Sequence, residues 1–301
     1  MTSAFWYAEP GRLRTPWRLA VFLLATAGAM IVIQSLVYPI VITLAGWTGS
    51  HPSLEGWNLA ASLLLAHLAV VRWMDHLSWD TVWLGPRAAK PKAIGVAFIM
   101  GAAAIGIPCL VLLTIGWLRR DAASPGSELA LAGRAALFFL PYALFEELFL
   151  RGYVLRVLRD ALGWRWALAA TSLVFGALHI RNPGATGVSI ALVVLAGICL
   201  GAVVLVMESV YAAWAAHFAW NWTMAAVVHA SVSGLPFTAV DFRLVDAGPD
   251  WATGGAWGPE GGVAAGFGMA AALLFLFSRP QARSLITGAR SVDRGGVQHG
   301  N

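Results

Sequence analysis

Residues 182–207 read NPGATGVSIALVVLAGICLGAVVLVM and contain no Asp, Glu, Lys or Arg. A hydrocarbon core of roughly 30 Å is crossed by about 20 apolar residues in helical form. Lipid offers the backbone no hydrogen-bonding partners, so a segment that enters it must form its hydrogen bonds internally. The stretch therefore predicts a membrane-spanning α-helix.

Similar uncharged stretches occur along most of the chain. They lie between Arg18 and Glu55, Glu55 and Arg72, Lys92 and Arg119, Arg165 and Arg181, and Glu208 and Asp241. Hydrophobic residues make up 59% of the 301 positions and charged residues 12%, about half of the charged share of a soluble domain. So few charges do not cover the surface of a soluble protein of this size, and we expect lipid to surround most of the chain.

The apolar runs predict an all-α fold, a polytopic membrane bundle of about eight transmembrane helices. The expected helices cover residues 18–46, 57–73, 93–118, 132–158, 164–180, 186–206, 210–231 and 261–278. Together they form a single integral membrane domain over residues 18–278. The polar residues 279–301 are expected to be a disordered cytoplasmic tail. The first run is too long for the apolar part of a cleaved signal peptide, so we interpret it as a membrane helix.

The basic residues are divided unevenly between the predicted loops. With the N-terminus inside, the cytoplasmic segments hold fourteen Lys and Arg residues and the outer segments hold five. Positive residues favour the cytoplasmic side of a membrane, so we expect both termini in the cytoplasm. The longest outer loop, residues 231–262, is interpreted as a spacer rather than a flexible lid, with Phe242, Trp251 and Trp257 exposed.

The net charge of +5 does not indicate a nucleic-acid partner. The basic residues are scattered through short loops and the tail, without the basic stripe that nucleic-acid binding requires. Cys109 and Cys199 both lie in apolar runs and lack the spacing of a disulfide framework or a thiolate metal site. The lipid bilayer is therefore the first partner that the composition predicts.

Three charged residues stand close together in the expected fourth helix, where residues 145–152 read FEELFLRG. Each charge at the centre of a membrane helix costs roughly 2.5–3.5 kcal/mol. Glu147 and Arg151 have the four-residue spacing of an ion pair on one helix face. This pairing leaves Glu146, about 100° round the helix, without a local partner. Alternatively, the cluster marks the cytoplasmic end of the helix, where Arg151 reaches the interface.

Polar residues on two further helices favour a site over a helix end. His179 ends the expected fifth helix and shares a face with Phe175. His217 and Asn221 share a face of the seventh helix. Counted from the cytoplasmic helix ends, Glu146, His179 and Asn221 all lie roughly 20 Å deep. We therefore expect these three helices to meet in one polar site.

The four polar side chains suit the hydrolysis of a peptide bond without a Ser or Cys nucleophile. A carboxylate beside a histidine can deprotonate water and return the proton to a leaving amine. A second histidine and an amide can donate hydrogen bonds to an oxyanion. We set aside two other histidines: His67 is interpreted as a packing residue and His229 as an interfacial one.

Three motifs occur in order within about residues 132–225, which we regard as a catalytic core. They are EExxxR at Glu146, Glu147 and Arg151, FxxxH at Phe175 and His179, and HxxxN at His217 and Asn221. Together they resemble the CAAX-protease and bacteriocin-processing family of intramembrane proteases, also called the type II CAAX prenyl endopeptidase or Abi family. The first three expected helices and the last carry none of these motifs.

The resemblance implies a role for each matched residue. Glu146 and His179 would activate water, and His217 and Asn221 would stabilise the oxyanion. The residues expected to support the site structurally are Glu147, Arg151 and Phe175.

The resemblance leaves two possibilities for a metal, because family members have been described both as metalloproteases and as metal-independent glutamate-type enzymes. The sequence contains no HExxH, but Glu146, His179 and His217 can supply the three protein ligands of a catalytic zinc site. Asn221 is a poor zinc ligand and a good amide donor, which suits an oxyanion held without a cation. We therefore expect no metal and no cofactor, with zinc as the alternative.

The function that we expect is that of an intramembrane endopeptidase acting on a membrane-associated protein or peptide. The compact, Ala- and Gly-rich chain looks bacterial, so we expect it in a bacterial cytoplasmic membrane and assign it no CAAX substrate. One alternative is a non-catalytic membrane scaffold of the same family. Another is a small proton-coupled transporter in which the glutamates and histidines relay protons, although the sequence lacks the internal repeats typical of transporters.

Overall fold

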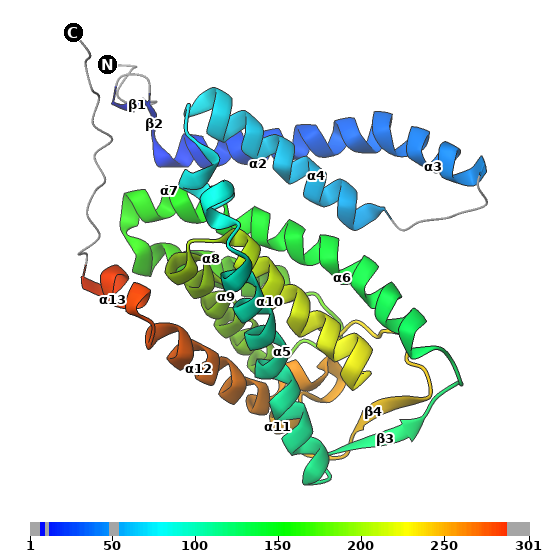
Figure 1. The fold of residues 1–301 in the computed structure, drawn as a ribbon. Helices are drawn as coiled ribbons and strands as arrows, with labels where there is room; N and C mark the ends of the chain where they lie inside the picture. Colours follow the sequence, from blue (N-terminus) through cyan, green and yellow to red (C-terminus); the bar gives the residue numbers. More distant parts are fainter. Residues whose placement is uncertain (1–6, 10–11, 48–53, 288–301) are drawn as a thin grey trace.

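The structure, a computed structural model, describes residues 7–9, 12–47 and 54–287 (Figure 1). The α-helices are α2 (Thr15–Val32), α3 (Tyr38–Trp47), α4 (Glu55–His67), α5 (Pro91–Thr114), α6 (Glu128–Arg151), α7 (Tyr153–Leu162), α8 (Trp164–Leu178), α9 (Gly187–Met207), α10 (Val210–Trp222), α11 (Asp250–Thr253), α12 (Val263–Phe277) and α13 (Pro280–Thr287). The strands are β1 (Tyr7–Glu9), β2 (Arg12–Leu13), β3 (Leu118–Ala122) and β4 (Phe242–Asp246). The π-helical segments are η1 (Ile33–Val37), η2 (Leu68–Met74) and η5 (Thr223–Val228), and the 3₁₀ segments are η3 (Trp79–Val82), η4 (Pro86–Ala88), η6 (Gly255–Trp257) and η7 (Pro259–Gly261).

The helical membrane bundle predicted from the sequence is confirmed. Each of the eight expected ranges contains a helix. Within the described residues, five helical segments are long and apolar enough to cross a membrane: Thr15–Leu44, Glu55–Met74, Pro91–Thr114, Glu128–Leu162 and Gly187–Met207. The π-helical segments contribute to this length, because η1 joins α2 to α3 and η2 extends α4. The chain is therefore an integral membrane protein.

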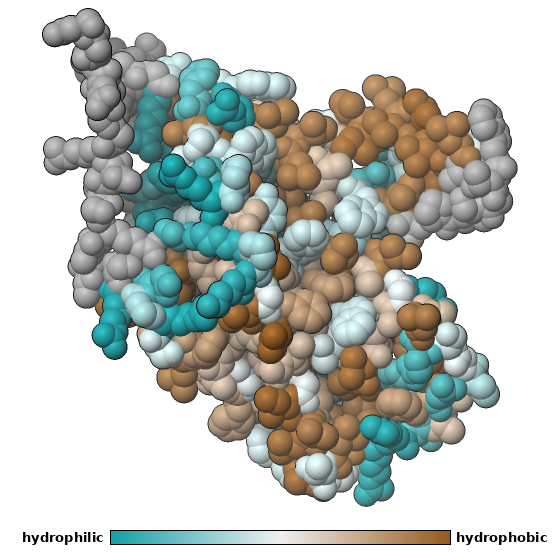
Figure 2. Space-filling view, in the orientation of Figure 1, coloured by the Kyte–Doolittle hydropathy of each residue, from teal (hydrophilic) through white to brown (hydrophobic). Residues whose placement is uncertain are grey.

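The surface agrees with a lipid environment (Figure 2). Hydrophilic residues gather around α7 and near β3 and β4, which lie at opposite ends of the molecule. Large aliphatic side chains instead project from α2, η1 and α3, among them Leu24, Ile31, Leu36 and Ile40. A soluble protein rarely exposes so continuous an apolar surface, so these side chains face lipid.

Helix α10 lies at the centre of the bundle. It packs against α5, α6 and α9, while α8 packs against α7 and α9. Helix α12 covers α5 and α9, and α2 reaches the bundle through α4, which lies on α6. The three helices that carry the expected site, α6, α8 and α10, are thus interior or directly adjacent elements.

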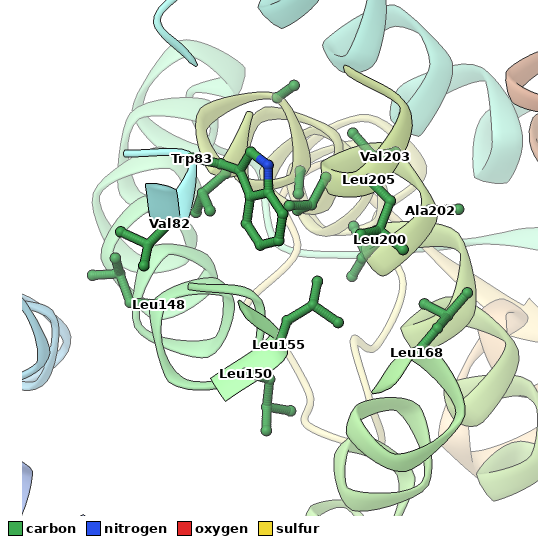
Figure 3. Packing of buried hydrophobic residues seen from close by; sticks show 14 of the residues in the cluster. Val82, Trp83, Leu148, Leu150, Leu155, Leu168, Leu200, Ala202, Val203 and Leu205 are labelled. Atoms are coloured by element: carbon green, nitrogen blue, oxygen red, sulfur yellow. The ribbon is translucent and has the colours of Figure 1, made fainter. Parts of the chain in front are cut away.

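A cluster of buried aliphatic side chains anchors one end of these helices (Figure 3). It combines Leu148 of α6, Leu155 of α7, Leu168 of α8 and Leu200 of α9, with Trp83 from a connecting segment. Close van der Waals packing of this kind drives helix association in membranes. The cluster includes Leu148, the residue directly after the paired glutamates, and so fixes the end of α6 that carries them.

The expected helix over residues 132–158 is divided into two helices, because the chain turns at Gly152. Helix α6 ends at Arg151, and α7 begins at Tyr153 in a new direction. The Tyr153 backbone N–H donates to Nε2 of His67, 3.1 Å away, instead of continuing the helix. A Cβ atom at position 152 would lie 2.2 Å from the same Nε2, so only glycine fits this close approach.

The segment 231–262, expected to be an outer loop, is folded against the bundle and is more than a spacer. Strand β4 within it pairs antiparallel with β3, from Leu118 opposite Asp246 to Ala122 opposite Phe242. Trp257, expected to be exposed, is fully buried. Its burial fixes the short turns η6 and η7 beneath the start of α12.

Part of the expected disordered tail is helical. Residues Pro280–Thr287 form α13, which packs against α9 and α12. Ala282 and Leu285 are buried in that contact, and their burial explains why this segment is ordered. The remainder of the expected tail, residues 288–301, lies outside the described residues.

Candidate active site

The neighbouring glutamates of α6 have different environments. The side chain of Glu147 is fully buried, whereas 28% of the Glu146 side chain is exposed. Successive helical residues point about 100° apart. Glu147 consequently lies in the interior of the bundle, and Glu146 borders a cavity between the helices.

Glu147 forms the ion pair with Arg151 that the spacing predicts. Their atoms Oε1 and Nη1 are 3.4 Å apart, and both side chains are fully buried. Nη2 of Arg151 also donates to the carbonyl oxygen of Gly197 on α9, 3.5 Å away. Its guanidinium carbon lies 4.3 Å from the ring centre of Phe175 on α8. The buried cation thus contacts groups on three helices, which compensates part of its desolvation.

His217 of α10 lies between the two glutamates. Its Nδ1 is 2.9 Å from Oε1 of Glu147, and its Nε2 is 3.7 Å from Oε2 of Glu146. The shorter contact is a hydrogen bond that fixes the orientation of the ring. The Nε2 atom is therefore directed toward Glu146 and the cavity.

His179 is held in a similar way at the C-terminal end of α8. Its Nδ1 is 2.8 Å from the carbonyl oxygen of Phe175, one turn earlier. Because a carbonyl only accepts hydrogen bonds, Nδ1 carries the proton and Nε2 is left as an acceptor. The Phe175 ring lies 4.8 Å from the His179 ring and 6.0 Å from the His217 ring, so it supports both histidines.

The four candidate catalytic residues line one cavity of about 100 Å³. Glu146 comes from α6, His179 from the end of α8, and His217 and Asn221 from successive turns of α10. Most of the remaining wall is apolar and comes from α5, α9 and α12. The structure therefore brings together the four polar groups that the sequence placed on three separate helices.

Helix α5, which carries no motif, closes one side of the cavity. A Cβ atom at Gly101 would lie 2.1 Å from the carbonyl oxygen of Ala216. The glycine thus lets the α5 backbone approach α10 directly beside His217. Met100 and Ala104, on either side of Gly101, also line the cavity.

Sequence reasoning missed three polar lining residues, Trp220, Ser233 and Glu260. Trp220 lies beside Asn221 on α10, while Ser233 and Glu260 belong to the segment 231–262. The Trp220 indole N–H donates to Oε2 of Glu260 across 2.6 Å. The only sequence signal for Glu260 was an acidic residue directly before the last apolar run, and that signal is equally typical of a solvated helix end.

The candidate zinc ligands do not form a complete metal site. Each histidine forms a hydrogen bond to a neighbour through Nδ1, as metal-ligating histidines commonly do, and Nε2 of His217 lies 3.7 Å from Oε2 of Glu146. Nevertheless, within the described part of the chain no three His, Cys, Asp or Glu side chains come together in a group able to hold a metal ion. Glu146, His179 and His217 line the same cavity without converging as a zinc site requires.

The two histidines that were set aside lie outside the cavity. His67 is fully buried at the turn between α6 and α7, where its Nδ1 is 2.8 Å from the carbonyl oxygen of Leu63. His229 is also buried; its Nδ1 is 2.8 Å from the carbonyl oxygen of Phe242 and its Nε2 is 3.1 Å from Glu128. Both histidines therefore connect segments of the fold.

Comparison with known proteins identifies the part of the chain that carries the site. Residues 128–223 match a family described as Type II CAAX prenyl endopeptidase Rce1-like. No curated protein and no solved structure matches the chain. The matched segment runs from the first residue of α6 to just beyond Asn221 and includes all three motifs. Residues 128–223 are therefore similar to the type II CAAX prenyl endopeptidase Rce1-like family, in agreement with the resemblance that the motifs indicate.

Proposed function

We propose that this protein is a glutamate-type intramembrane endopeptidase that cleaves a membrane-associated protein or peptide. The observation that carries the proposal is the shared cavity of Glu146, His179, His217 and Asn221 inside a membrane bundle. The family implies a protease-type activity in general. The catalytic type, the residue roles and the substrate are our inference from the chemistry of the cavity.

Glu146 is the proposed general base. Its Oε2 atom has no hydrogen-bond partner among the described protein atoms, and the side chain borders the cavity. A carboxylate in this position can accept a proton from water as the water oxygen attacks the scissile carbonyl carbon. His179 assists by accepting a hydrogen bond from the same water through its free Nε2.

His217 and Asn221 are the proposed donors to the oxyanion. The attack converts the carbonyl oxygen into an anion, which needs donors already in place. As an imidazolium, His217 donates one N–H to Glu147 and presents the other, at Nε2, to the cavity. The Asn221 amide lies one helical turn away and supplies the second donor.

Collapse of the tetrahedral intermediate completes the reaction. The carbon–nitrogen bond breaks as the carbonyl forms again, and the leaving nitrogen takes the proton that Glu146 accepted from water. The products are a carboxylic acid and an amine, and Glu146 returns to its ionised form. No covalent intermediate with the enzyme is involved.

Glu147, Arg151 and Phe175 position these groups without contacting the substrate. Glu147 holds His217 by the 2.9 Å hydrogen bond, and Arg151 balances the charge of Glu147. Phe175 lines the cavity and separates it from Arg151, whose guanidinium contacts the ring. The arrangement keeps the positive charge of Arg151 away from the water that Glu146 must deprotonate.

We further propose that the reaction uses no metal, with zinc as the alternative. The fit of Glu146, His179 and His217 to a zinc ion is incomplete, and the Asn221 amide provides an oxyanion donor that needs no cation. We also propose that the protein resides in a bacterial cytoplasmic membrane with both termini in the cytoplasm, as the distribution of basic residues favours.

Comparison of membrane peptidomes tests this function. Cells that express the wild-type protein should contain cleaved membrane peptides that are missing with Glu146→Gln, although both proteins insert equally. Glu128→Gln is the matched control, because it removes a carboxylate from the same helix outside the cavity and should leave the cleavage pattern unchanged. Identical peptidomes for wild type and Glu146→Gln would refute the enzyme and favour the scaffold.

A further inference from the structure

Glu260 is a buried carboxylate that lines the cavity from outside the family segment. It lies in η7, directly before α12, and only 7% of the residue is exposed. It shares the cavity with Glu146, His179, His217 and Asn221. The reaction proposed above assigns it no role.

All hydrogen-bonding partners of Glu260 in the described chain are donors. The Trp220 indole N–H lies 2.6 Å from Oε2, and the Ser233 hydroxyl lies 2.8 Å from Oε1. The Ser233 backbone N–H also donates to Oε1. The Asn182 side chain fixes Ser233 in turn by donating to its carbonyl oxygen across 2.9 Å. An ionised carboxylate has about four acceptor positions, so one position remains for a ligand.

Glu260 lacks a positive partner in the described part of the chain, where no Lys, Arg or His nitrogen forms an ion pair with it. The described cavity lining contains no Lys or Arg. Arg151 is engaged with Glu147 behind the Phe175 ring, and His217 lies next to Glu146. Glu260 therefore adds an unbalanced negative charge to a largely apolar cavity.

If Glu260 only anchored the segment 231–262, its negative charge would not be required. Uncharged side chains or backbone carbonyls also accept hydrogen bonds from an indole, a hydroxyl and a backbone N–H. Burying an unpaired carboxylate costs several kcal/mol, which a cation at the free acceptor position offsets. A cavity with carboxylates in a largely apolar wall also concentrates cationic ligands.

We propose that Glu260 determines specificity by binding a cationic side chain, Lys or Arg, of the peptide substrate. The inference rests on the proposed peptidase function and names a substrate class for the same cavity. Because Glu260 lines the same cavity as Glu146, His179, His217 and Asn221, the cationic residue lies close to the scissile bond. Trp220 connects the two parts of the site, since it holds Glu260 and directly precedes Asn221.

Matched membrane-spanning peptides test the proposal. The two peptides of a pair have the same sequence except at one position, where one carries Lys and the other carries norleucine, which lacks the ammonium group. Successive pairs place this position at each residue of the peptide in turn. For one of these positions, wild-type protein in liposomes should cleave the Lys peptide with a kcat/KM roughly 30-fold or more above that for the norleucine peptide. Glu260→Gln should abolish this preference while the norleucine peptide is cleaved at a similar rate.

Two further variants separate recognition from folding. Glu260→Asp retains the charge and should retain a preference for Lys, whereas a purely structural role predicts equal losses for both peptides. Asp246→Asn is the matched control: Asp246 accepts hydrogen bonds from Gly248 and Thr253 in the same segment but does not line the cavity. This variant should leave the preference unchanged. Equal losses for both peptides with Glu260→Gln and with Glu260→Asp would overturn the proposal.

Binding measurements distinguish failure of this inference from failure of the peptidase. Fluorescent Lys and norleucine peptides are titrated into Glu146→Gln protein with and without Glu260→Gln. Lys-selective binding that requires Glu260, together with no cleavage by wild type, would overturn the peptidase and support the cation site. Cleavage by wild type without any Lys preference would support the peptidase and overturn the cation site.

Discussion

Oε1 of Glu147 is 2.9 Å from Nδ1 of His217 and 3.4 Å from Nη1 of Arg151. One buried oxygen therefore connects the positioning pair of α6 to a candidate oxyanion donor of α10. The four-residue spacing indicates the contact with Arg151, but the contact with His217 joins residues 70 positions apart. Disturbing Glu147 should consequently affect both the stability of the fold and the orientation of His217.

Glu147→Gln should lower the free energy of unfolding by about 3–5 kcal/mol, because Arg151 would stay buried without its counter-charge. Glu146→Gln should have a much smaller effect on stability, since Glu146 is partly exposed and has no buried ion pair with an arginine. Thermal and denaturant unfolding in detergent micelles measure the difference. Equal stability of the two variants would contradict this division of roles.

Gly152→Ala should destabilise the turn between α6 and α7. Its Cβ atom would lie 2.2 Å from Nε2 of His67, and overpacking of this kind costs about 1–3 kcal/mol. Gly133→Ala is the matched control, because a Cβ atom there meets nothing within 4 Å and should stabilise α6 by up to about 1 kcal/mol. Addition of His67→Ala should reduce the cost of Gly152→Ala, and strictly additive losses would argue against the steric explanation.

The turn at Gly152 also shows what the sequence predicts and what it leaves open. The apolar runs and the four-residue spacings are local, so they predict the helices and the Glu147–Arg151 pair. The turn depends on His67, 86 residues from Tyr153, and the local pattern gives no indication of it. The depth comparison counted Glu146 from the end of an expected helix over residues 132–158, whereas α6 ends at Arg151.

The sequence did not predict Glu260 as a site residue, for a related reason. Its position depends on donors from Trp220 and Ser233, 40 and 27 residues away in the sequence. Composition describes residues 231–262 only as a polar, Gly-containing loop. The folding of that segment against the cavity is a tertiary property that local patterns do not contain.

Reporter fusions test the proposed orientation in the membrane. Fusions at Lys90 and at the C-terminus should report a cytoplasmic location, and a fusion at Asp250 should report an external one, because basic residues favour the cytoplasmic side. The structure places α7 and α13 at one end of the molecule and β3 and β4 at the other (Figure 1). An external signal at Lys90 would contradict this topology.

Asn221→Ala should reduce kcat by roughly 10²–10³, the usual effect of removing one oxyanion donor. KM should change little, because the donor acts mainly on the transition state. Steady-state cleavage of a reconstituted peptide substrate measures both constants. A rise in KM at constant kcat would assign Asn221 to substrate binding instead.

Purified protein should cleave its substrate without a stoichiometric metal ion. A zinc enzyme needs its ligands to converge at about 2.0–2.2 Å from one ion, and within the described residues no group of three suitable side chains does so. Nδ1 of His217 instead forms a hydrogen bond to Oε1 of Glu147, and its Nε2 lies 3.7 Å from Oε2 of Glu146. A histidine between two carboxylates suits a charged hydrogen-bond donor better than a neutral metal ligand. Elemental analysis of active protein and assays with a chelator measure the requirement. One zinc per chain, with activity lost to the chelator and restored by added zinc, would reverse the assignment and make Glu146, His179 and His217 the metal ligands.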